Sequence, residues 1–178
     1  MSSFSLSLQG NADTLNVKRY RNPNADGKWR WVIYDLDWGF YVDTNSIRRW
    51  LDPAGMGAGK RTDNSLFIAL MNNATFRDQF LHFMGDQLAT QWTSGRIVEM
   101  IRERYELLLP EMPRQCERWG TSLNTFESEV ARLANYAKER PRKLLNYFFG
   151  QFDFTEEERE KYFGDAMERI REEEAQWA

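Results

Sequence analysis

The stretch from Lys28 to Trp38, KWRWVIYDLDW, constrains the fold of this chain more than any other segment. Its first half is aromatic and β-branched, which suits a pleated and partly buried strand. Asp35 and Asp37 follow at the end of that strand, each beside large apolar residues. Desolvating a carboxylate there is costly unless a cation or hydrogen-bond donors compensate. The segment therefore indicates either a site for Mg²⁺ or Ca²⁺ or a turn whose Asp side chains cap the next residues.

An extended segment before this strand predicts an antiparallel hairpin. The residues between the two strands, NPNADG, contain Asp26-Gly27, which is a strong signal for a turn. We expect residues 16–21 to pair with residues 28–35. The hairpin would then bring four oxygen-bearing side chains from its entry and its exit towards one end: Asp13, Asn16, Asp35 and Asp37.

Composition narrows the classes of protein to consider. The 178 residues suit one medium domain with a real core, and 42% hydrophobic with 15% aromatic content argues against disorder. No apolar run reaches the length of a membrane span, and residues 1–30 lack the pattern of a signal peptide. The single histidine, His82, and the single cysteine, Cys116, argue against a zinc site or a Ser-His-Asp triad. We expect both residues to be structural.

Charge is distributed unevenly along the chain. From Phe154 onward there are nine acidic and four basic residues, which gives this end a charge of −5. The net charge of the whole chain is −3, so the preceding residues carry about +2. An acidic last helix and the lack of a basic stripe argue against nucleic acid as a partner.

From Thr62 onward the spacing of apolar residues is helical, so the expected fold is mainly α with a small antiparallel β-hairpin (α+β). Proline should end two of the helices, at Pro110 with Pro113 and at Pro141. Thr155 and Glu158 form a capping box that opens the last helix. The expected helices cover residues 46–51, 63–72, 75–91, 94–109, 123–138, 142–149 and a last segment from 155. The stripe of that last helix, which should pack on the helical body or on another copy, is Phe163, Met167, Ile170 and Trp177.

These patterns organise the chain into two parts. Residues 1–153 would form one domain, with a metal-binding hairpin at 10–40 and a helical body at 44–150. Residues 154–178 would form an acidic amphipathic helix.

The order of several motifs resembles the CotH family, the spore-coat-protein-H-like proteins regarded as atypical protein kinases. The resemblance runs from about Gly10 to Phe149, and its two N-terminal blocks are the most specific. The motifs that carry it are GNADTLNVKRYR, KWRWVIYDLDWGF, SLFIALMNNATFRDQF, Leu109-Pro110-Glu111, Arg118-Trp119 and Arg140-Pro141.

The resemblance implies an active site on the larger, helical lobe of a kinase-like fold, with ATP and Mg²⁺ or Mn²⁺ as cofactors. The matching essential acids are Asp13 and Asp35, of which one would orient or deprotonate the acceptor hydroxyl while the other holds the metal. Asp35 stands where D-F-G places its Asp, and Asp37 and Asn16 would be further metal ligands. Spacing alone does not decide which of Asp35 and Asp37 is the main ligand.

The resemblance also implies a protein substrate and a spore-coat or bacterial cell-surface setting. Only nine residues precede Gly10, so we expect the carboxy-terminal part of a kinase domain that is weak or inactive as this chain. The apolar side chains of the hairpin would then be exposed and would support a homodimer. Two alternatives stay open: a non-catalytic binding or scaffold module that keeps the fold, and a phosphohydrolase that uses the same carboxylates.

Overall fold

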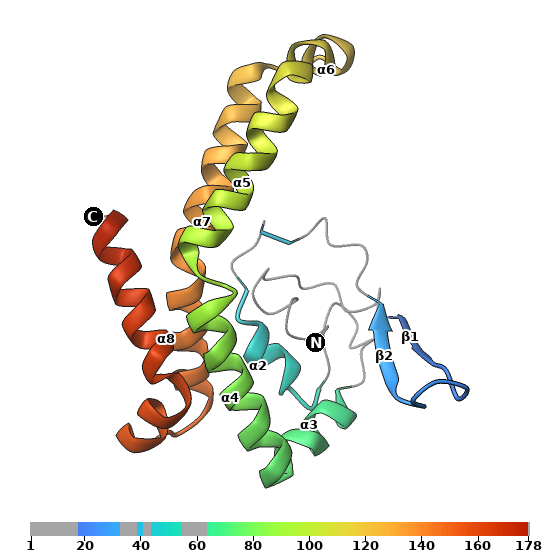
Figure 1. The fold of residues 1–178 in the computed structure, drawn as a ribbon, viewed down its shortest axis with the longest axis vertical. Coiled ribbons are helices and arrows are strands. Elements are labelled where there is room, and N and C mark those ends of the chain that lie inside the picture. Colours follow the sequence, from blue (N-terminus) through green and yellow to red (C-terminus); the bar gives the residue numbers. More distant parts are fainter. Residues whose placement is uncertain (1–17, 33–38, 41–43, 55–63, 178) are drawn as a thin grey trace.

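A computed structural model of the chain describes residues 18–32, 39–40, 44–54 and 64–177 (Figure 1). Within them lie one small sheet and a series of helices, which confirms a mainly α fold with a β-hairpin. The elements are β1 (Lys18–Arg21), β2 (Trp29–Val32), α2 (Ser46–Trp50), α3 (Ser65–Asn72), α4 (Ala74–Thr90), α5 (Ser94–Leu108), a 3₁₀ turn (Leu109–Glu111), α6 (Met112–Trp119), α7 (Leu123–Gln151) and α8 (Glu156–Trp177).

The predicted hairpin is present. β1 pairs antiparallel with β2, in a register that sets Lys18 opposite Val32 and Arg21 opposite Trp29. Gly27 at φ 66° provides the left-handed position of the turn. The Asp26 carboxylate accepts two hydrogen bonds from the Arg30 guanidinium, at 2.9 and 2.7 Å. These two bonds, together with the hydrogen bond that the Lys28 amide donates to the same carboxylate, lower the pKa of Asp26.

The exposed apolar side chains of the hairpin do not share one face. Tyr20 and Val32 lie on one face of the ribbon and Trp29 on the other, because alternate residues of a strand point to opposite sides. All three are largely exposed, at 51%, 42% and 56%. A homodimer through the hairpin stays a prediction.

The helices form a packed body from which an arm extends (Figure 1). α4 packs along α8, and α5 runs antiparallel to the first half of α7. α6 lies at the far end of the arm, between α5 and α7. No described helix is both long and apolar enough to cross a membrane.

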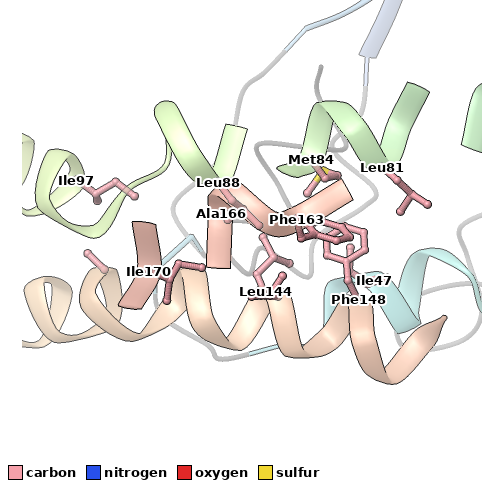
Figure 2. Close-up of a cluster of buried hydrophobic side chains, with 12 residues drawn as sticks. Ile47, Leu81, Met84, Leu88, Ile97, Leu144, Phe148, Phe163, Ala166 and Ile170 are labelled. Atoms are coloured by element: carbon pink, nitrogen blue, oxygen red, sulfur yellow. The ribbon is translucent and has the colours of Figure 1, made fainter. Parts of the chain in front are cut away.

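The core lies where α4, α7, α8 and α2 meet (Figure 2). Met84 and Leu88 of α4, Leu144 and Phe148 of α7 and Phe163 of α8 are almost fully buried. The Phe163 ring packs against Phe148 with the centroids 5.3 Å apart. Most helical stability comes from burying an apolar face, so α8 is part of the body rather than an appendage.

The start of α8 confirms the predicted capping box. The Thr155 hydroxyl accepts from the Glu158 amide at 3.2 Å, and the Glu158 carboxylate accepts from the Thr155 amide at 3.0 Å. Phe163 and Ile170 of the predicted stripe are buried, Met167 is partly buried, and Trp177 remains 40% exposed against the Lys138 ammonium. The stripe packs on the helical body, as expected.

One expectation about proline was wrong. α7 continues through Pro141 as one helix from Leu123 to Gln151, where a break was expected. Packing compensates: Pro141 is buried, and the Ser94 hydroxyl donates at 3.0 Å to the Lys138 carbonyl, in the turn that proline disturbs.

A further difference concerns the residues after α5. That helix ends before Pro110 as expected, at Leu108 rather than at residue 109, but a 3₁₀ turn and α6 follow where no helix was expected. Pro110 and Pro113 occupy first-turn positions of these two elements. Proline is tolerated there because the first amides of a helix have no intrahelical acceptor.

A buried carboxylate of α8 caps the start of α5. Glu173, which is 6% exposed, accepts from the Ser94 amide at 2.7 Å and from the Gly95 amide at 2.9 Å. The Thr93 hydroxyl accepts from the next amide, that of Arg96. Each amide of the first turn therefore has an acceptor, and the negative charge lies at the positive end of the α5 dipole.

We expect Glu173→Gln to lower the free energy of unfolding by about 1–2 kcal/mol, because the amide group would present a donor to one of these two N–H groups. Chemical denaturation at neutral pH measures the change. The adjacent Glu172→Gln is the matched control, since Glu172 is exposed and lies 3.5 Å from Arg169. Equal effects of the two variants would contradict the cap.

Candidate functional site

The four residues predicted to form the metal site, Asp13, Asn16, Asp35 and Asp37, lie outside the described residues. Their convergence and their roles stay predictions. The described residues on either side of these positions show how the chain next to the predicted site is held.

The register of the hairpin places the described residues nearest the two acidic blocks opposite each other. Lys18, the first residue of β1, is paired with Val32, the last residue of β2. Asn16 comes two residues before this pair and Asp35 three residues after it. The chain therefore enters from one acidic block and leaves towards the other at the same end of the ribbon.

Phe40 closes the DLDWGF segment in an unusual conformation. Its φ of 60° is the one positive value among the described residues other than glycine. A bulky L-residue pays roughly 1–2 kcal/mol in this region, and such positions gather at functional sites. Two contacts with α7 hold Phe40: Arg132 Nη1 donates to its carbonyl at 2.9 Å, and its ring packs edge-on against Tyr136 at 5.5 Å.

Arg140 holds the chain four residues further on. Its side chain is 1% exposed, and Nη2 donates at 3.0 Å to the Thr44 carbonyl and at 3.4 Å to the Ser46 hydroxyl. The guanidinium lies between two aromatic rings, with Cζ 5.6 Å from the Tyr136 ring centre and 5.4 Å from that of Tyr147. A guanidinium on aromatic faces gains cation–π energy while its N–H groups stay available as donors.

Arg132 and Arg140 therefore attach α7 to the chain at Phe40 and at Thr44. Tyr136 contacts both attachment points, since its ring touches Phe40 and the Arg140 guanidinium. Sequence analysis missed these roles. The one available signal was the Arg140-Pro141 pair among the family motifs, because a charged residue among the apolar positions of a long helix is unusual unless it has partners.

His82 and Cys116 take part in packing. The His82 ring lies edge-on to Tyr162 with the centroids 4.8 Å apart, and Cys116 is buried on α6 as a free thiol. Nearby, Asp78 accepts from Lys161 at 2.7 Å and from Tyr162 at 2.9 Å, which together lower its pKa. These bonds join α4 to α8. Within the described part of the chain, no three His, Cys, Asp or Glu side chains cluster as a metal site would require.

Comparison with known proteins identifies the family. The model of the family described as CotH kinase protein matches residues 7–144, most of the chain, and the chain belongs to this family. Curated proteins and solved structures gave no significant match. The matched region includes both acidic blocks and Arg140, and it ends within α7, before α8.

Proposed function

We propose that this chain carries the metal- and nucleotide-binding site of a CotH-type protein kinase, which transfers the γ-phosphate of ATP to a hydroxyl of a protein substrate. The observation that carries the proposal is the family match over residues 7–144, which contain both acidic blocks in order. The pairing of Lys18 with Val32 supports it, because both blocks adjoin the same end of the hairpin.

The chemistry of the donor set suits the proposed cofactors. Carboxylate and amide oxygens are hard ligands of the kind that bind Mg²⁺ and Mn²⁺. Asp35, with Asp37 and Asn16, would hold the cation, which when bound neutralises charge on the β- and γ-phosphates.

Asp13 would act on the acceptor. Its carboxylate would orient the substrate hydroxyl and take its proton as the hydroxyl oxygen forms a bond to the γ-phosphorus. The bond from that phosphorus to the β,γ-bridging oxygen breaks, and ADP leaves. Phosphoryl transfer makes little covalent demand on the protein and depends on positioning and electrostatics.

The contacts of α7 supply rigidity for such a site. A catalytic group must be held by side chains whose own positions are fixed by packing and hydrogen bonds. Arg132 and Arg140 provide hydrogen bonds of this kind to the chain that follows the D-x-D-W block.

The test combines binding with transfer. Calorimetric titration with ATP and Mn²⁺ should give a signal for the wild type, and any transfer from γ-labelled ATP to the chain and to casein should be weak. Asp35→Asn should weaken metal-dependent binding and lower any transfer by at least about 100-fold, since it removes a charge from the metal site. Asp26→Asn is the matched control, because Asp26 lies in the turn at the other end of the same hairpin.

Each other outcome points to an alternative. Absence of both binding and transfer in the wild type would contradict the kinase and favour a scaffold module. Hydrolysis of ATP without labelled protein would favour a phosphohydrolase.

A further inference from the structure

A groove of about 670 Å³ lies on the arm formed by α5 and α7. Ile101 and Tyr105 of α5 line it together with Phe126, Val130 and Leu133 of α7. Phe40 also borders it. Two antiparallel helices bury only the side chains that lie between them. The apolar residues along the edge of the α5–α7 contact therefore stay exposed and form this groove, which a third helix could occupy.

The shape of the groove suits a helix better than a small molecule. Met100 and Leu108, which line it, are 52% and 49% exposed. A drug-sized ligand is normally buried over 70–90% of its surface, which so open a site does not provide. From Ile97 to Leu108 the lining covers about 16 Å of helix axis, or three turns. A helix laid in a groove makes contacts at i, i+3 or i+4, and i+7 over such a length.

The charge of the groove indicates which kind of occupant would fit it. Its charged lining residues are both arginines, Arg96 and Arg104. Arg96 donates to the neutral side chain of Gln91, and within the described residues Arg104 has no hydrogen-bond or ion-pair partner. By contrast, Arg102 on another face of α5 is held by Glu99 and Glu106. An occupant with carboxylates beside its apolar stripe would match this groove.

We propose that this groove binds an amphipathic helix of a partner protein, with apolar residues at helical spacing flanked by Asp or Glu. The chain's own acidic helix, α8, is not the occupant, because Phe163, Ala166 and Ile170 of its apolar face are buried in the core. Since Phe40 borders the groove, the bound helix would lie beside the residue that ends the DLDWGF segment. The proposal does not depend on phosphoryl transfer.

The test is a selection that needs no ATP. A displayed library of helical 14-residue peptides, random at the non-alanine positions, is enriched for binding to the wild-type chain. Selected peptides should carry apolar residues at i, i+3 or i+4, and i+7 and more acidic than basic residues. Fluorescence anisotropy then gives the Kd of the best peptide for each variant.

Two variants probe the groove and one controls for charge. Met100→Glu places a charge in the groove, and Arg104→Glu reverses the charge that should attract the peptide. Each should raise the Kd at least about 10-fold, and the Arg104 effect should shrink in high salt. Arg77→Glu, an exposed arginine of α4 outside the groove, should leave the Kd within about 2-fold.

The contrary results are distinct. Recovery of no binder, of basic peptides, or of peptides insensitive to Met100→Glu would each overturn the proposal. Dodecanoate binding at the groove, detected by calorimetry with no peptide selected, would show a small amphiphile as the ligand instead. Circular dichroism of each variant shows whether it is folded, and an unfolded Met100→Glu is replaced by Met100→Gln, with the same criterion.

Discussion

Arg140→Met should lower the free energy of unfolding by about 2–4 kcal/mol, because methionine fills the space of the side chain but donates no hydrogen bond. The Thr44 carbonyl and the Ser46 hydroxyl, both in buried residues, would each lose a charged donor. Hydrogen bonds to charged groups contribute about 1.5–3 kcal/mol each, and the Thr44 carbonyl keeps the bond that it accepts from the Ser46 amide at 2.9 Å. Urea denaturation followed by tryptophan fluorescence measures the loss.

Arg142→Met is the control for this substitution, two residues along the same helix. Arg142 makes an exposed ion pair with Glu174 at 2.7 Å, which raises the pKa of Arg142 and lowers that of Glu174. Exposed pairs contribute about 0–1 kcal/mol, so the loss should be clearly smaller than for Arg140→Met. A loss from Arg140→Met no larger than the control's would mean that the bonds to Thr44 and Ser46 contribute little.

The same variant tests the link between α7 and the proposed site. If Arg140 positions the chain after the D-x-D-W block, Arg140→Met should weaken binding of ATP with Mn²⁺ at a temperature where the variant remains folded. Arg140→Lys, which keeps the charge but not the guanidinium fork, should recover only part of that binding. Unchanged binding in the folded Arg140→Met variant would restrict Arg140 to a structural role.

Gly85→Ala should lower the free energy of unfolding by about 2–3 kcal/mol, although alanine is the better helix former by about 1 kcal/mol. Gly85 lies on α4 where α8 crosses it. A Cβ there would overlap the carbonyl oxygen of Tyr162 and lie 2.9 Å from its carbonyl carbon. Backbone atoms of a helix cannot rotate away, so the two helices would have to separate and loosen the packing around Phe163.

The matched control is Gly150→Ala, at the end of α7, where a Cβ would meet no atom within 4 Å. This variant should be stabilised by about 0.5 kcal/mol through helix propensity alone. Thermal unfolding should therefore shift in opposite directions, with the midpoint lower for Gly85→Ala and higher for Gly150→Ala. A shift of the same sign in both variants would show that α4 and α8 tolerate a methyl group at their contact.

The hairpin and most of the helices could be predicted because their signals are local. Asp26-Gly27 specifies a turn through its own backbone preferences, and the strands flanking it pair as expected. The Thr155 and Glu158 pair opens α8 because both of its hydrogen bonds form within one turn. Such features depend on neighbouring residues and need no distant partner.

The errors arose where distant parts of the chain compensate a local preference. Pro141 disfavours a helix on its own, yet α7 continues because Pro141 is buried and the Ser94 hydroxyl donates to the Lys138 carbonyl in the preceding turn. Glu173 reads as one more acid of a charged helix, but it caps α5 from a helix almost eighty residues away. Neither partner can be found from spacing along the chain.

The sequence by itself determined the acidic blocks of the proposed site, the turn that pairs their strands and the family, because each of these is a matter of residue identity and order. Only the tertiary structure decided which residues of α7 contact the chain after the D-x-D-W block and where the arm leaves apolar side chains exposed. Arg132 and Arg140 of α7 contact Phe40 and Thr44, residues about ninety positions earlier in the chain. The groove along α5 and α7 exists because two helices pack side by side. The physical reason is that burial and hydrogen bonding between distant segments form only after the chain has folded, so no local pattern records them.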